Sequence, residues 1–117
     1  MVARYWLGRT DALSDFGVER ATDGVTVHFR DLMPQATTYT YEVKAPRYES
    51  PKKTTDRPEF TIGREVLAAA KENAGANAPI EVNIWTHRQD FTSNPVTLYF
   101  DCSPTSETFA IRKISRS

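Results

Sequence analysis

The sequence predicts a single antiparallel β-sandwich of seven or eight strands with one short α-helix. Two observations lead there: apolar and polar residues alternate in several segments, and turn residues separate those segments. Alternation with a period of two is the pattern of a strand with one buried face and one wet face. It is clearest in Val25–Arg30, Tyr39–Lys44, Ile80–Trp85 and Val96–Asp101. Because parallel strands are covered on both faces and are apolar throughout, the alternation favours antiparallel sheets.

Length and composition agree with one globular domain spanning residues 1–117. A chain of 117 residues with 39% hydrophobic residues is long enough to bury about two thirds of its unfolded surface. Fifteen basic residues balance fifteen acidic ones. A nucleic-acid-binding protein usually carries a basic excess, so we expect no nucleic acid among the partners.

The chain also lacks the usual signals for export or membrane insertion. Cys102 is the one cysteine and cannot form an internal disulfide. The first seventeen residues contain no apolar core of a signal peptide, which needs about 7–15 apolar residues. No stretch approaches the ~20 apolar residues of a membrane-spanning helix. We therefore expect a protein made in the cytoplasm, where it stays or joins a larger particle such as a virion.

The expected strands follow from the alternation and from the turn residues between them. Asp23-Gly24 is a strong turn signal, and Pro34 interrupts ladder pairing because it has no N–H group. The predicted strands are Met1–Leu7, Phe16–Glu19, Val25–Arg30, Thr38–Ala45, Phe60–Ile62, Ile80–His87, Val96–Asp101 and Thr108–Ile114.

Two loops and one helix complete the predicted fold. Ala45–Pro58 contains three prolines and is predicted to be a long loop. Arg88–Pro95 is predicted to be the tip of a hairpin. Arg64–Ala74 is predicted to be a helix with a narrow apolar stripe, so we expect it to cap one end of the sandwich.

One segment resembles a motif of fibronectin type III domains. Leu32–Ala45 resembles their pattern L-x-P-x-T-x-Y-x-(aromatic)-x-V-x-A, which in that family spans the corner between the fifth and sixth strands. Here Thr38 stands where the family has its tyrosine, and the tyrosine follows at Tyr39. The resemblance implies an immunoglobulin-like or fibronectin type III-like sandwich.

Three later segments are similar to the closing half of immunoglobulin-like modules, including modules carried on bacterial surface proteins and phage virions. They are Phe60–Ala69, Ile80–Ile84 and Ser93–Leu98. Stand-alone chains of this kind and size are similar to phage head or tail accessory proteins. The resemblance therefore implies a role in such an assembly.

No motif for catalysis, a cofactor or a metal is present. His28 and His87 are the only histidines, their spacing fits no local metal site, and by parity both lie on outer strand faces. Cys102 has no signature of a nucleophilic cysteine. We predict no enzyme activity, no cofactor and no metal, and a small hydrolase using Cys102 or His87 is the weakest interpretation.

The candidate binding residues lie on the predicted hairpin of the second half. If the apolar residues of Ile80–His87 and Val96–Asp101 face inward, then Trp85, His87 and Tyr99 face outward. We expect the hairpin to place Trp85 opposite or diagonal to Tyr99, as a cross-strand aromatic pair. Exposed Trp and Tyr are frequent at interface hot spots. Arg88 is expected to form a polar rim beside the pair, and Phe91 to lie at the hairpin tip.

The Ala45–Pro58 loop supplies a second group of candidates: Arg47, Lys52 and Lys53. Its positive charges outnumber its negative ones by two. They are expected either to be solvated or to dock on an acidic protein surface.

The sequence as a whole predicts a non-enzymatic module that binds protein partners in a multi-subunit assembly such as a phage head or tail. Those partners are further copies of the chain or other virion subunits. The alternative is a carbohydrate-binding module in which Trp85, Tyr99 and Phe91 stack on sugar rings.

Overall fold

The computed structural model describes residues 13–32, 37–74, 79–88, 91–93, 95–102 and 109–116. These ranges form ten strands and one helix. The elements are β1 (Leu13–Ala21), β2 (Gly24–Asp31), β3 (Thr37–Ala45), β4 (Tyr48–Glu49), β5 (Lys53–Thr55), β6 (Glu59–Gly63), α2 (Arg64–Ala74), β7 (Ile80–Arg88), β8 (Phe91–Thr92), β9 (Val96–Cys102) and β10 (Phe109–Arg116). The predicted strand Met1–Leu7 lies outside the described residues.

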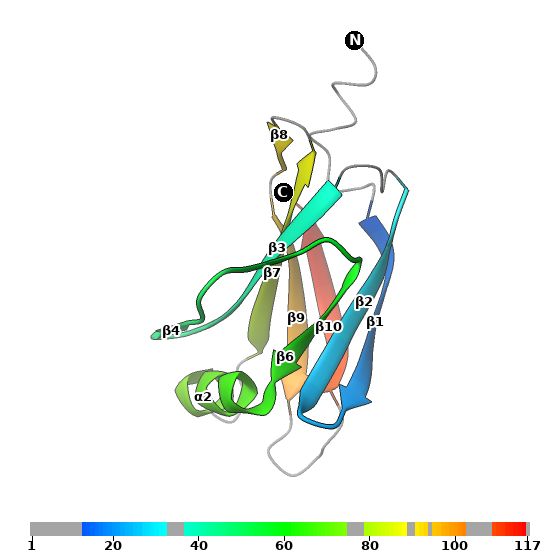
Figure 1. The fold of residues 1–117 in the computed structure, drawn as a ribbon. Helices are drawn as coiled ribbons and strands as arrows, with labels where there is room; N and C mark the ends of the chain where they lie inside the picture. The colour runs from blue at the N-terminus through cyan, green and yellow to red at the C-terminus, as the bar shows by residue number, and fades with distance from the viewer. Residues whose placement is uncertain are drawn as a thin grey trace.

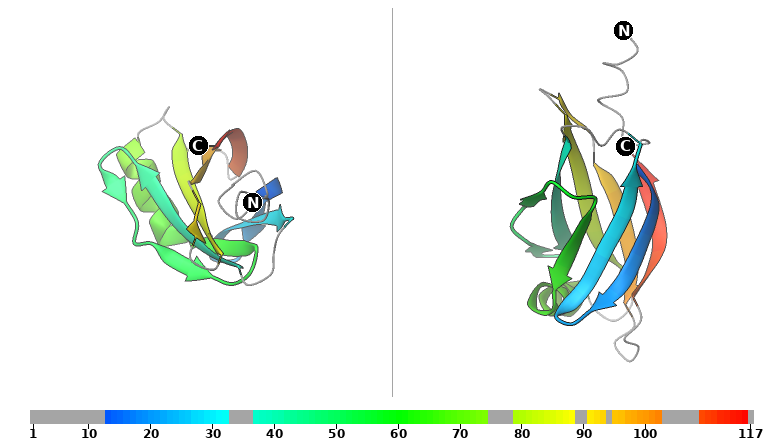
Figure 2. Two further views of the ribbon diagram at one scale, coloured as in Figure 1. Left: turned by 90° about the horizontal axis from the view of Figure 1, so that it is seen from above. Right: turned by 45° about the vertical axis from the view of Figure 1, so that its right-hand side comes forward.

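The strands form two antiparallel sheets that face each other across the core (Figure 1). The smaller sheet has the order β1-β2-β6. The larger sheet has the order β10-β9-β7-β3-β4. In addition, β5 pairs with β3 and β8 pairs with β7. The two further views show the sheets as separate layers, with β1 beside β10 where they meet (Figure 2). The predicted antiparallel sandwich is confirmed.

The core contains the apolar residues that the alternation placed inward. The residues less than a tenth exposed include Val25, Val27 and Phe29 on β2; Tyr39 and Val43 on β3; Ile80, Val82 and Ile84 on β7; and Val96, Leu98 and Phe100 on β9. Full burial of such a side chain stabilises the fold by roughly 1.5–3 kcal/mol. Burial on alternate positions thus decides which face of each strand points inward.

Aromatic contacts join the two sheets near their centre. Phe29 of β2 meets Tyr39 of β3 edge-on, with ring centroids 5.1 Å apart. Phe60 of β6 stacks on Tyr41 of β3, with centroids 3.9 Å apart. Such pairs add about 0.5–1.5 kcal/mol beyond the area they bury, so they help to fix the position of β3 beneath the smaller sheet.

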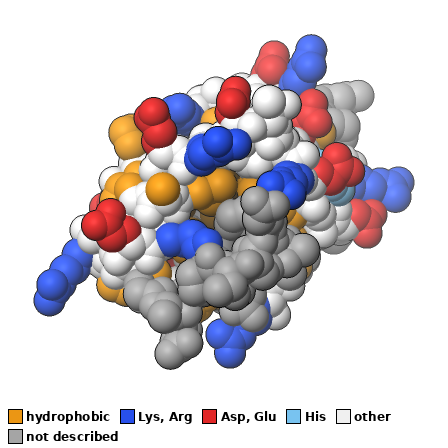
Figure 3. Space-filling view, turned by 90° about the horizontal axis from the view of Figure 1, so that it is seen from below, with side chains coloured by type: hydrophobic (Ala, Val, Ile, Leu, Met, Phe, Trp, Pro, Cys, Tyr) orange, Lys and Arg blue, Asp and Glu red, His pale blue; other side chains and the backbone are white. Residues whose placement is uncertain are grey.

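Helix α2 has the predicted bounds and lies at one end of the sandwich, beside β3, β4 and β6 (Figure 1). Leu67 and Ala70 are buried and Val66 is partly buried, as the apolar stripe predicted. The Arg64 N–H donates to the Asp23 carbonyl at 2.6 Å, which ties the helix start to the β1–β2 turn. Seen from this end, acidic and basic side chains are interspersed (Figure 3). No helix of the described residues is long and apolar enough to cross a membrane.

The prediction that Ala45–Pro58 is only a loop is wrong, because β4 and β5 pair with the edge of β3. Between them Ser50 holds the chain: its N–H donates to the Val43 carbonyl at 2.9 Å, and its Oγ accepts from the Val43 N–H at 2.8 Å. Lys44 pairs with Glu49 and Tyr41 with Lys53. Three residues between β4 and β5 therefore lie opposite two residues of β3, and the longer segment forms a bulge. Pro51 falls in that bulge, where a proline is tolerated.

The segment that resembles the fibronectin type III motif lies earlier in the fold than the motif does in that family. Leu32–Ala45 runs from the end of β2 through β3, and does not connect a fifth strand to a sixth. The Tyr39 hydroxyl donates to the Asp31 carboxylate at 2.5 Å. The similarity therefore reflects turn and strand chemistry common to sandwiches.

Edge strand β1 begins at Leu13, earlier than predicted, and contains a bulge between Ser14 and Gly17. Asp15 in the bulge has a φ of 54°. At Gly17 a Cβ atom would lie 2.2 Å from the His28 ring, so a larger residue here would require the His28 side chain to move. Bulges on an edge strand oppose pairing with another chain.

Candidate functional site

The candidate site is the face of the larger sheet that points away from the smaller sheet, which we call the outer face. The cross-strand register sets its side chains in rows across β3, β7, β9 and β10. Its members are Thr38, Thr40, Glu42, Lys44, Glu81, Asn83, Trp85, His87, Thr97, Tyr99 and Lys113.

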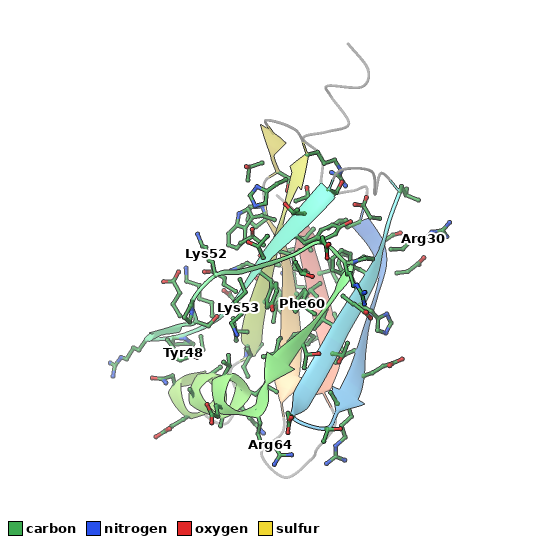
Figure 4. The ribbon with its side chains drawn as sticks, viewed as in Figure 1. Arg30, Tyr48, Lys52, Lys53, Phe60 and Arg64 are labelled. Carbon is green, nitrogen blue, oxygen red and sulfur yellow. The ribbon has the colours of Figure 1, made fainter. Side chains whose placement is uncertain are left out.

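Trp85 is partly buried on this face, where it lies opposite Thr40. The Lys52 ammonium lies 4.7 Å from the centre of the Trp85 ring. Lys52 extends from the segment between β4 and β5 (Figure 4), which brings a residue of the predicted loop to the predicted hairpin. A cation over an indole ring is stabilised by about 0.5–1 kcal/mol at an exposed site.

The predicted pairing of Trp85 with Tyr99 is wrong. Tyr99 lies opposite Glu81, and Ile84 lies opposite Val96. Trp85 and Tyr99 are therefore four residues apart along the strand direction, roughly 13 Å. Parity correctly put both on one face, but parity leaves the register of a hairpin with a long tip undetermined. Tyr99 is approached instead by the Lys113 ammonium, 5.6 Å from its ring centre.

A row of polar side chains crosses the outer face between these two aromatic residues. The Asn83 amide donates to Glu42 Oε1 at 3.2 Å, and the Thr97 hydroxyl donates to Asn83 Oδ1 at 2.5 Å. Glu42 is only 4% exposed, although parity places it on the face that we expected to be wet. Sequence reasoning missed this burial, because the alternation gives the face of a residue and not what covers it.

The second carboxylate oxygen of Glu42 has no hydrogen-bond partner in the part of the chain that the structure describes. Among the described residues, Oε2 is a buried side-chain atom without a hydrogen bond, and the ion pairs found there do not include Glu42. A buried carboxylate without an opposite charge destabilises the folded state. Beneath the outer face there is thus a buried acceptor that the described residues leave unsatisfied.

His87 lies on the outer face, as predicted, and both of its ring nitrogens have partners. Nε2 lies 2.7 Å from the Thr40 hydroxyl and Nδ1 lies 2.9 Å from the Thr92 hydroxyl. The ring therefore links β3 to β8 across β7. This arrangement holds the imidazole in place as a structural bridge.

The prediction that Arg88 forms an exposed polar rim is wrong. Arg88 is 1% exposed, and its Nη2 donates to Asp31 Oδ1 at 2.7 Å. The other Asp31 oxygen accepts from Tyr39. Position 88 has the inward parity of Ile84, and that was the signal in the sequence. A buried guanidinium needs a carboxylate partner, which the end of β2 supplies.

The surroundings of Tyr39, which lies beside Asp31 and Arg88, raise the pKa of its hydroxyl. Burial raises the pKa of Tyr39, and the hydrogen bond to Asp31 and its negative charge raise it further, while Arg88 acts in the opposite direction. Burial also raises the pKa of Tyr41. Both hydroxyls stay protonated at neutral pH, so these residues form part of the internal structure.

The remaining candidates do not join the outer face as one cluster. Arg47 is exposed in the β3–β4 turn with a φ of 63°. Lys53 is exposed too and lines a shallow pocket between the β4–β5 segment, β6 and α2, together with Tyr41, Val43, Ser50, Pro51, Thr61, Ile62, Gly63 and Val66. The side chains of Phe91 and Cys102 lie outside the description. No group of three or more His, Cys, Asp or Glu in the described ranges could hold a metal ion.

No protein-family model and no curated protein sequence matches the chain. One similar solved structure is the rat CD45 extracellular region, domains d3-d4, with a TM-score of 0.51 and 12% identity. The match covers 90% of this chain and 48% of the CD45 chain, so the chain spans about half the length of that structure. At this identity the likeness concerns the fold, which is an immunoglobulin-like, fibronectin type III-like β-sandwich.

Proposed function

We propose that this protein is a non-enzymatic binding module that holds a partner protein on its outer face. One observation carries the proposal: Glu42, between the partly exposed Trp85 and Tyr99, keeps a buried carboxylate oxygen without a partner among the described residues. Aromatic residues around a desolvated polar group are typical of interface hot spots. Sandwich folds serve many functions, so the argument rests on this face.

Other features of the described residues support binding over catalysis. The imidazole of His87 is engaged on both sides by threonine hydroxyls. The one strongly buried ion pair, between Arg88 and Asp31, is enclosed within the sandwich. Neither group is placed to act on a substrate.

The setting that we propose is a multi-subunit assembly such as a phage head or tail, with further copies of the chain or other virion subunits as partners. Support for this setting comes from the resemblance in the sequence. Size-exclusion chromatography with light scattering tests the self-assembly part: we expect an oligomer that Trp85→Ala reduces to a monomer. A wild-type monomer would leave other subunits as the partners.

A sugar-binding role is less well supported by the same face. A sugar platform made of both rings would need Lys52 to leave Trp85 and Lys113 to leave Tyr99. The two rings also lie too far apart along the sheet to form one platform. A glycan array on which binding depends on Trp85 would favour sugar over protein.

Photo-crosslinking from two matched positions tests the proposed function. Thr97 lies on the outer face and Thr26 on the far face of the smaller sheet; both are partly exposed strand threonines. Benzoylphenylalanine is placed at one or the other position and irradiated in extract of the cells that make the protein. We expect a discrete adduct from position 97 that Trp85→Ala removes. Adducts from position 26 alone, or equally from both positions, would contradict the proposal.

A further inference from the structure

We infer that the outer face binds an arginine side chain of the partner, with its guanidinium hydrogen-bonded to Glu42 Oε2 and stacked on Trp85. The inference rests on the proposed function and names the chemistry of the partner at that site. It follows from the charge of Glu42, its place beside Trp85, and the cations already found over the aromatic rings.

Glu42 is buried, and the ion pairs found among the described residues do not supply it with a positive charge. The residue is 4% exposed, and within the described ranges its carboxylate accepts a hydrogen bond from the neutral Asn83 amide. Oε2 has no donor among the described residues. Since buried carboxylates are normally paired with a cation or a set of N–H donors, the group that completes this site is a cationic N–H donor.

Trp85 lies one row from Glu42 on the same face. Thr40 pairs with Trp85 and Glu42 pairs with Asn83, so the two rows are two residues apart, roughly 7 Å. A guanidinium over the indole is about large enough to span this separation, and it reaches the buried Oε2 when the side chains that cover Glu42 move on binding. Lys52, an exposed residue, already places an ammonium 4.7 Å from the centre of the Trp85 ring, so this ring accommodates a cation.

A guanidinium fits the site better than an ammonium or a metal ion. It is planar, it stacks on aromatic faces, and its edge N–H groups donate to carboxylate oxygens. The ammonium of Lys52, a point charge, lies over the ring and leaves Glu42 Oε2 without a partner. A metal ion needs several ligands, and the described residues gather no such acidic or histidine group here.

Lys52 occupies the place that the arginine would take. It is exposed and lies in the bulge opposite Glu42, so a change in its side-chain conformation frees the ring. The arginine then adds a hydrogen bond to Glu42 that Lys52 does not make. Removing the lysine with Lys52→Ala should therefore strengthen the binding of an arginine probe.

The test is a titration of the full ¹⁵N-labelled chain with N-acetyl-arginine amide, followed by NMR. We expect shifts in the Trp85 indole signal, assigned with Trp85→Phe, and in the amide signals of Glu42 and Asn83. Glu42→Gln should weaken binding about tenfold, as expected for loss of a charge-assisted hydrogen bond. The matched control is Glu59→Gln on β6, which changes an exposed carboxylate on the far sheet and should leave binding unchanged.

The outcomes separate this inference from the proposed function. Equal arginine binding by wild type and Glu42→Gln, or binding of methyl glucoside but not of arginine amide, overturns the inference. If position 97 still crosslinks a protein in that case, the proposed function stands, and the partner contacts the outer face through a group other than arginine. If both experiments fail, both proposals fall.

Discussion

Arg88, Asp31 and Tyr39 form a buried polar cluster whose members depend on one another. The side chains of Arg88 and Asp31 are each 1% exposed and 2.7 Å apart. Replacing Arg88 with Met leaves the Asp31 charge without its guanidinium, and we expect a loss of about 3–5 kcal/mol in the free energy of unfolding. Urea denaturation measures it.

A second variant separates the charge from the packing. In Asp31→Asn/Arg88→Met neither charge is present, so the double variant should be more stable than the sum of the single losses indicates. The double variant is compared with Arg88→Met and Asp31→Asn. If its loss of unfolding free energy equals the sum of the two single losses, the side chains act independently and the proposed coupling is wrong.

Tyr39 makes stability depend on alkaline pH. Its pKa is raised above the ordinary value of 10.0 by burial and by Asp31. Above about pH 10 an unfolded tyrosine loses its proton while folded Tyr39 keeps it. The unfolded chain then binds fewer protons, so stability falls as the pH rises. Urea unfolding from pH 8 to 11 should show a shallower fall for Tyr39→Phe than for wild type; identical slopes would exclude a contribution from Tyr39.

For single residues, alternation in the sequence predicts which face of the sheet a side chain lies on. It does not predict which other side chains bury it. Parity places Arg88 inward, so its burial was predictable and was overlooked. Glu42 also follows parity and lies on the outer face. Its burial depends on residues distant in sequence, such as its hydrogen-bond partner Asn83 on β7, and spacing along the chain does not reveal these.

At the scale of elements, serine side chains hold two short strand segments to the larger sheet. The Ser50 hydroxyl accepts from the Val43 N–H at 2.8 Å, and the Ser93 hydroxyl accepts from the Thr86 N–H at 2.9 Å. Each serine N–H also donates back to the same partner residue. The hydroxyl replaces a backbone carbonyl where the ladder is interrupted.

We expect Ser50→Ala to destabilise the fold by about 1–3 kcal/mol, because the Val43 N–H loses its acceptor in a buried position. Hydrogen exchange of that amide should accelerate more than exchange in β2. The exposed Thr54→Ala on the adjacent strand is the control and should leave the Val43 amide protected. Unchanged exchange in Ser50→Ala would contradict the role given to the hydroxyl.

The elements that periodicity defines well were predicted with nearly correct bounds, and the others were not. Helix α2 has the predicted ends, Arg64 and Ala74. Strands β4 and β5 were missed because they are held by pairing with β3 and by Ser50, with little burial of their own. The register between β7 and β9 also depends on the conformation of a long connection.

At the scale of the whole molecule, the two sheets have different outer surfaces. The smaller sheet presents exposed or partly exposed polar residues such as Thr26 and Thr61, which bond to each other at 3.0 Å. The larger sheet presents Trp85 and Tyr99 around the buried Glu42. The fold class could be predicted from alternation alone, whereas this difference arises from packing between strands distant in sequence.

Thermal unfolding of Glu42→Gln without any ligand tests most directly whether this face is kept for binding at a cost to stability. A buried charge without a partner is more destabilising than a neutral amide of the same shape. We therefore expect the Tm of Glu42→Gln to rise by a few degrees, while Glu59→Gln leaves it unchanged. A lower Tm for Glu42→Gln would show that the carboxylate stabilises the folded chain, and would contradict the assignment of this face as a binding surface.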